Sequence, residues 1–158
     1  MIETTAIKSL LGNIIFLSTI TSLFSAQIFK MLIFLLTHRD KKPWEAIETA
    51  IWRTGGMPSS HSAVVCSLTT STGIVEGISS NLFVFSLFFA LVVLRDALGV
   101  RRAAGLQAKA LNTLGKQTAA KTGLEFSSVK EIQGHTPLEV VVGAVLGILI
   151  AIGFYIIL

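Results

Sequence analysis

Two of the three histidines occur where a polar segment turns into an apolar one, the kind of position at which a membrane helix begins. The first is His61, in the string GGMPSSHS. Pro58, together with Ser59 or Ser60, supplies a helix start and a hydroxyl cap there. The pattern therefore predicts that His61 lies in the first turn of a helix.

The second is His135, in the string GHTPLEVVVG. Thr136 is a natural N-cap residue and Pro137 a natural first helical residue, so His135 is expected directly before a helix. The N-terminus of a helix presents backbone N–H groups and the positive end of the helix dipole, and both favour bound phosphate. Two helix starts that each carry a histidine indicate phosphate chemistry.

The expected topology allows the two histidines to meet. Two membrane crossings separate them, and an even number of crossings returns the chain to the same membrane face. Basic side chains expected at that face would add positive charge around a phosphate. These candidate phosphate ligands are Lys30, Arg53, Arg101, Arg102 and Lys130.

Each candidate also has a structural interpretation. Ser59 and Ser60 are typical helix caps, and Thr136-x-x-Glu139 fits a capping box. Lys30 can extend its ammonium toward the membrane surface, and the paired arginines can anchor the chain there. Taken singly, these structural roles are the commoner ones. The convergence of two motifs on one face favours a functional site.

The elements that must position these residues are membrane helices. Of the 158 residues, 52% are hydrophobic and 14% are charged, and the mean hydropathy is +0.74. Four windows lack Asp, Glu, Lys and Arg: 9–29, 54–75, 77–94 and 140–158. Since about 20 apolar residues cross a bilayer as a helix, the sequence predicts a small polytopic membrane protein. Disorder, collagen and coiled coil are excluded.

The expected helices differ in character. Residues 9–36 form a long apolar run, and the Ser- and Thr-rich window after Arg53 suits a helix inside a bundle. Residues 77–94 and 137–158 are plainly apolar. Residues 101–116 place three basic residues beside an apolar stripe of Leu106, Ala110 and Leu114, a pattern typical of a helix at the membrane surface or against a second subunit. The prediction is a single all-α domain, 1–158, with about four transmembrane helices plus an amphipathic surface helix.

Charge and cysteine content limit the partners. The net charge is +4, but the basic residues lie between the apolar segments rather than among aromatic residues, so anionic membrane lipids are expected as partners and nucleic acid is not. The single cysteine, Cys66, forms neither an internal disulfide nor a zinc knuckle. Four short helices bury little surface around a charged site, so a homodimer is a reasonable expectation.

Pro58-Ser59-Ser60-His61 resembles the Pro-Ser-Gly-His motif of type 2 phosphatidic acid phosphatases, which are related to vanadium haloperoxidases. His135-x-x-x-Glu139 resembles their final His-x-x-x-Asp. The strings GGMPSSHSA, DALGVRRAAGLQAKALN and GHTPLEVVVGAVLG together are similar to the divergent branch of short membrane proteins in this family. The resemblance covers most of the chain.

Three positions depart from the family pattern. The family's first motif has Arg-Pro seven positions after a lysine, where this chain has Thr37 after Lys30. Val129 stands six residues before His135, where the family has an arginine, and Lys130 follows it. The final acid is Glu139 in place of Asp.

The resemblance implies hydrolysis of a phosphate or diphosphate on a lipid or isoprenoid without a metal or other cofactor. In this scheme His135 attacks phosphorus and forms a phosphohistidine, and Glu139 orients its ring. His61 protonates the leaving oxygen and then activates water. Ser59, Ser60 and the basic residues would stabilise the negative charge.

Two alternatives remain open. His61, His135, Asp96 and Glu139 could bind a divalent cation for metal-assisted hydrolysis. Alternatively, the protein could bind or move an anionic lipid without cleaving it. The positive-inside rule places both basic segments, 37–59 and 99–137, and with them both histidine motifs, in the cytoplasm, with both termini outside.

Overall fold

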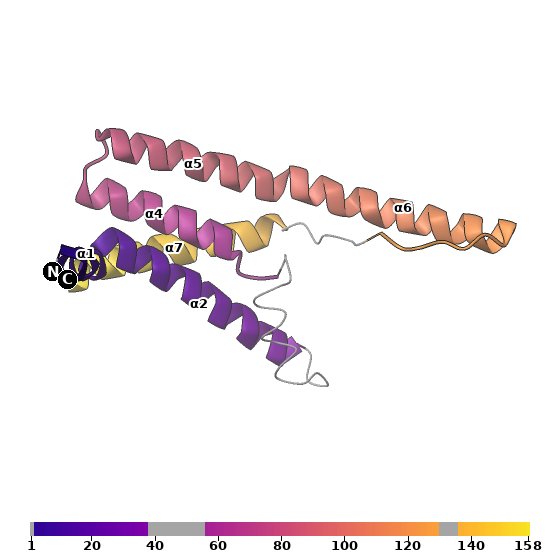
Figure 1. Cartoon of the computed structure of the whole chain (residues 1–158), viewed down its shortest axis with the longest axis horizontal. Coiled ribbons are helices and arrows are strands. Elements are labelled where there is room, and N and C mark those ends of the chain that lie inside the picture. Colours follow the sequence, from indigo (N-terminus) through magenta and orange to yellow (C-terminus); the bar gives the residue numbers. More distant parts are fainter. Residues whose placement is uncertain (1, 38–55, 130–135) are drawn as a thin grey trace.

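The protein is an all-α, polytopic membrane helix bundle, as the sequence predicts. The computed structural model describes residues 2–37, 56–129 and 136–158, with side chains for these residues except 2–6 and 100–102. The helices of this part of the chain, shown in Figure 1, are α1 (Ile2–Leu11), α2 (Ile14–Thr37), α4 (Ser60–Val75), α5 (Asn81–Leu98), α6 (Val100–Thr122) and α7 (Pro137–Ile157).

Length and composition single out three stretches of the described chain that can cross a membrane. They are α2, the stretch from Asn81 to Thr122 that contains α5, and α7. α4 has 16 residues and is therefore about 24 Å long, whereas the hydrocarbon core of a bilayer is about 30 Å thick. α4 corresponds to the fourth span that the sequence predicts, a crossing that stays a prediction; it lies at the centre of the bundle, in contact with α2, α5 and α7.

The core of the bundle consists of small residues. α2 buries Ser18, Ser22, Ala26 and Lys30, which recur every four residues along one face. The other helices bury mainly serine, alanine, glycine and threonine. Large apolar side chains such as Phe85 lie on the outside. This distribution is that of a membrane protein, in which small residues let helices approach and large apolar residues face lipid.

α4 and α7 run parallel at very short range. A Cβ added to Gly147 would lie 2.1 Å from the carbonyl oxygen of Ala63, and one added to Gly143 would lie 2.3 Å from that of Ser59. Glycines four residues apart on α7 thus face small residues four residues apart on the α4 side, as in other membrane helix pairs with small residues at this spacing. α4 is the central buried helix that its Ser/Thr-rich sequence predicts.

The long N-terminal apolar run is divided into two helices, not one. Gly12 and Asn13 separate α1 from α2, and the side chain of Asn13 accepts a hydrogen bond from the backbone N–H of Phe16 at 3.1 Å. Asn is a strong N-cap residue because its side chain satisfies an N–H group that the helix cannot. The expected helix over 9–36 therefore begins at Ile14 and ends at Thr37.

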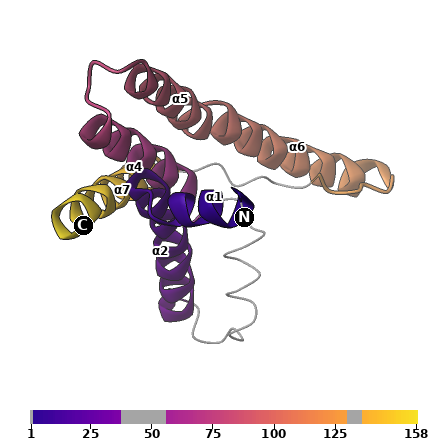
Figure 2. The ribbon, with the colours of Figure 1, turned by 60° about the vertical axis from the view of Figure 1, so that its left-hand side comes forward.

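α6 projects from the bundle. It continues beyond α5 in both views of the ribbon (Figures 1 and 2), and the two helices meet at Gly99. It is longer than the expected 101–116 and ends at Thr122; Gly123, directly after it, takes the left-handed conformation (φ 72°) that favours glycine at a helix end. Residues 123–129 then run back along α6.

Candidate active site

The start of α4 contributes the first group of residues to the candidate site. Ser59 is its N-cap: the Ser59 hydroxyl accepts hydrogen bonds from the backbone N–H and the hydroxyl of Ser62, at 3.4 and 3.0 Å. The capping role of Ser59 is therefore real, and Ser60, the first helical residue, is also buried. His61 follows in the first turn, as predicted, with an exposed side chain.

The start of α7 contributes the second group of residues. Thr136 is the N-cap, and its hydroxyl accepts from the backbone N–H of Glu139 at 3.4 Å. The Glu139 carboxylate accepts in return from the backbone N–H of Thr136 at 3.0 Å, which completes the predicted capping box. His135 directly precedes this cap but lies outside the described residues.

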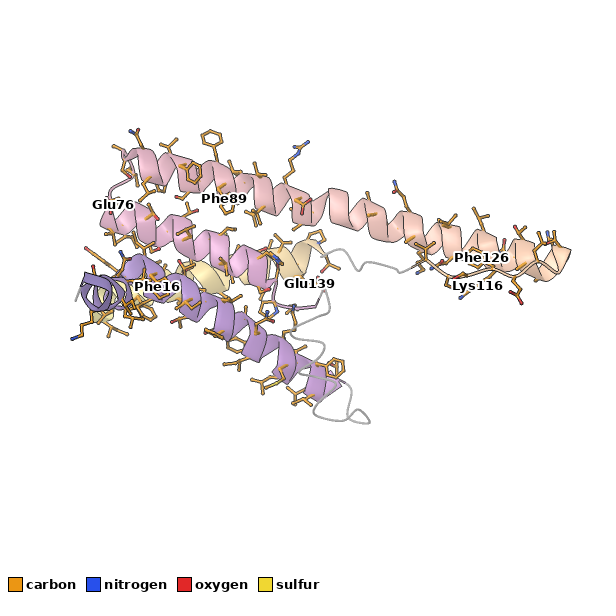
Figure 3. The ribbon with its side chains drawn as sticks, in the orientation of Figure 1. Phe16, Glu76, Phe89, Lys116, Phe126 and Glu139 are labelled. Atoms are coloured by element: carbon orange, nitrogen blue, oxygen red, sulfur yellow. The ribbon has the colours of Figure 1, made fainter. Side chains whose placement is uncertain are left out.

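A direct hydrogen bond joins the starts of α4 and α7. The backbone N–H of Ser59 donates to the backbone carbonyl of Glu139 at 3.0 Å. Gly143, one turn further along α7, lets the Ser59 backbone lie against that helix. Figure 3 shows Glu139 where the first turns of α4 and α7 meet. The two histidine motifs thus begin from adjoining helix N-termini, whose dipoles both favour negative charge at this end of the bundle.

Lys30 supplies a buried positive charge beside these N-termini. It is 6% exposed and ends the line of small residues on the buried face of α2. Its stem packs on Gly56, where a Cβ would lie 3.6 to 3.7 Å from three of its carbons. The Glu139 carboxylate attracts its ammonium group. Burial disfavours the charged form of an ammonium unless negative charge compensates it, and a phosphate beside it would add such charge.

Gly56 has a conformational reason to be glycine. Its φ of 91° lies in the left-handed region, which side chains rarely adopt. It therefore turns the chain into α4 while leaving room for the Lys30 stem. Nothing in the sequence analysis indicated that Lys30 packs on this glycine.

The other predicted phosphate ligands fall in two groups. Arg101 and Arg102 lie in the first turn of α6, directly after α5, and their side chains are not described. Arg53 and Lys130 lie outside the described residues, as does the predicted nucleophile His135. The structure therefore brings together Ser59, Ser60, His61, Glu139 and Lys30.

The chain leading to Lys130 and His135 is held by a contact that the sequence did not suggest. Asn112 on α6 donates through its amide nitrogen to the carbonyl of Val129 at 2.9 Å and accepts from the N–H of Val129 at 2.8 Å. This double hydrogen bond lies at the start of the segment 130–135. Asparagine on an amphipathic helix gives no sequence signal of such a partner, because the partner is a backbone group 17 residues away.

The metal alternative draws on residues that lie apart in the chain. Among the described residues, no group of three His, Cys, Asp or Glu side chains is placed to hold a metal ion. Asp96 lies in the last turn of α5, and His135 lies outside the described residues.

Two comparisons with known proteins give matches over most of the chain. The Divergent PAP2 family matches residues 11–150. The chain is also 37% identical, over 154 residues, to YuiD of Bacillus subtilis (strain 168), which is described as an uncharacterized membrane protein; the match covers 90% of this chain and 94% of the relative. No solved structure matches the chain. The chain therefore belongs to the Divergent PAP2 family.

Proposed function

We propose that the protein is a membrane phosphatase that hydrolyses a phosphate or diphosphate on a lipid or isoprenoid through a phosphohistidine. The observation that carries this proposal is the 3.0 Å hydrogen bond from Ser59 N–H to Glu139 C=O. It joins the helix starts that bear the two histidine motifs, and Lys30 lies buried beside them. A dianionic phosphate suits a place where two helix dipoles and an ammonium group converge.

The first chemical step forms a P–N bond and breaks a P–O bond. A ring nitrogen of His135 attacks phosphorus while the bond to the leaving oxygen breaks, and His61 donates a proton to that oxygen. Lys30 and the N–H groups of the first helical turns stabilise the charge that spreads over the phosphoryl oxygens. Arg53, Arg101, Arg102 and Lys130 are the further basic residues that we assign to the phosphate.

The second step reverses these roles. His61, now neutral, takes a proton from water as the water oxygen attacks phosphorus, and the P–N bond to His135 breaks. Phosphate leaves and both histidines return to their initial protonation states. Glu139 orients His135 through its other ring nitrogen in this scheme; a carboxylate has several acceptor positions, so this role is compatible with the bond to Thr136 N–H.

A panel of substrates tests this function. Detergent-purified protein is assayed for phosphate release from phosphatidic acid, lysophosphatidic acid and prenyl mono- and diphosphates, with and without a chelator. Turnover that survives chelation supports the proposal, and turnover that chelation abolishes supports the metal-assisted alternative. Lys30→Met should lose turnover, whereas Lys109→Met on the projecting helix is the matched control and should retain it.

A second candidate, lipid binding without cleavage, is favoured by one observation. Val129 occupies the position where the resemblance would place a phosphate-binding arginine, and its backbone is hydrogen-bonded to the Asn112 side chain. A protein of this kind would bind lipid phosphates in the same panel and release no phosphate from any of them. Binding with turnover would exclude it.

We further propose that the site faces the cytoplasm. Segments 37–59 and 99–137 carry an excess of basic residues, and the short connection 76–80 has none. The test uses Cys66→Ser with a single cysteine at Thr118, which is exposed on α6. An impermeant maleimide should label it after lysis and not in intact cells. Labelling in intact cells would place the site outside.

A further inference from the structure

α6 presents an apolar face that nothing in the described part of the chain covers. Among the described residues it contacts α5 and the returning segment 123–129, and no other helix. Leu106 and Leu114 are each 62% exposed. Exposed leucines on a helix that leaves the bundle indicate a surface that binds a membrane or another protein.

The returning segment covers the opposite face. The Phe126 ring lies over Gly115, where an added Cβ would come within 2.2 Å of it, and Asn112 binds the Val129 backbone. Helical spacing places Asn112 and Gly115 on one side of α6, and Leu106 and Leu114 on the other. Figure 3 shows Phe126 beside Lys116 at the far end of α6. The leucine face is therefore the side left open by this packing.

The charges of α6 favour a lipid surface over a second copy of the helix as the partner of this apolar face. The helix contains no Asp or Glu, and its basic residues are Arg101, Arg102, Lys109, Lys116 and Lys121. A second copy of α6 on this face would bring like charges together with no acid from the helix to offset them. An anionic lipid surface offers both apolar contact for the leucines and negative headgroups for the lysines.

We propose that α6 docks its leucine face on the anionic surface of the same membrane that the bundle spans. Gly99 is the place where the helix can turn from the direction of α5: it both ends α5 and begins α6, and its φ and ψ of −103° and −84° lie outside the helical region. Docking turns the projecting helix at this residue. The proposal is independent of whether the protein is a phosphatase.

Distance makes this proposal testable. Leu114 lies 16 residues beyond the end of α5, so an α6 that continued straight along the axis of α5 would hold it about 24 Å beyond that end. A docked amphipathic helix instead buries its apolar face about 5–10 Å into the boundary of headgroups and acyl chains. A probe at this position distinguishes the two arrangements.

The experiment uses full-length protein with Cys66→Ser and a fluorophore on Leu114→Cys. The protein is reconstituted into phosphatidylcholine vesicles with or without about 30% phosphatidylglycerol, a content high enough for a negative surface potential, and with nitroxide-bearing lipid as quencher. Ser127→Cys, on the returning segment, is the matched control. Quenching at 114 that depends on the anionic lipid, with little quenching at 127, is expected.

A charge variant tests the electrostatic part. Changing Lys109, Lys116 and Lys121 to Gln should lower the docked fraction, because each basic residue near an anionic surface is worth roughly a fivefold change in binding. High salt should lower quenching in the unchanged protein, so the test does not depend on this variant folding. Equal quenching with and without anionic lipid, or none, would overturn the proposal. Quenching replaced by contact between labels on two copies would also overturn it, in favour of a dimer.

Discussion

Gly143→Ala should destabilise the bundle by separating α4 from α7. The added Cβ would lie 2.3 Å from the Ser59 carbonyl oxygen, and ordinary contact begins at 3.4 Å, so the backbones must move apart by about 1.1 Å. Overpacking of this kind costs typically about 1–3 kcal/mol. The ratio of folded to unfolded protein should therefore fall by roughly 5- to 150-fold.

Gly153→Ala is the matched control, because it adds the same methyl group to the same helix. An added Cβ there has nothing within 4 Å, and alanine is the better helix former by up to about 1 kcal/mol. Unfolding of both variants by SDS in mixed micelles, followed by circular dichroism, compares them directly. Equal stability of the two variants would refute the close approach of α4 and α7 at Ser59.

Three further predictions concern the site. Lys30→Met should lower kcat about 100-fold or more, as for loss of one transition-state donor, without lowering the melting temperature, since Met keeps an apolar stem against Gly56 and Glu139 keeps its bond to Thr136 N–H; a drop in melting temperature with kcat unchanged would make Lys30 structural. His61→Ala should retain more activity on aryl phosphates than on alkyl phosphates, because a good leaving group needs less protonation; equal losses would argue against its role as the acid. Lys130→Ala should raise KM and lower kcat, since a flexible ammonium can bind phosphate as a point charge; unchanged steady-state kinetics would transfer this role to the arginine pair of α6.

Local signals predicted the two helix starts well. Ser59 and Thr136 cap α4 and α7 as their sequences indicate, and the capping box of Glu139 is present. Such caps depend on residues within one turn of each other, so the pattern contains the information needed. The small residues of α4 likewise indicated a helix inside the bundle.

Contacts between distant segments were beyond the sequence patterns. The bond from Ser59 N–H to Glu139 C=O uses backbone groups, which every residue has, and the Asn112 bonds to Val129 do the same. The break before α2 was missed because Asn13 stands in an otherwise continuous apolar run. In that run hydrophobicity and capping favour different helix limits, and the cap determines where α2 starts.

Trapping the phosphorylated intermediate tests the central claim most directly. Purified protein is mixed with a substrate labelled with ³²P in the transferred phosphoryl group, quenched in base within milliseconds, and separated from lipid. The account predicts label on the protein that is stable to base and lost in acid, as a phosphohistidine requires, present in His61→Ala and absent in His135→Ala. Turnover of the substrate with no label on the protein, or label that persists in His135→Ala, would contradict it.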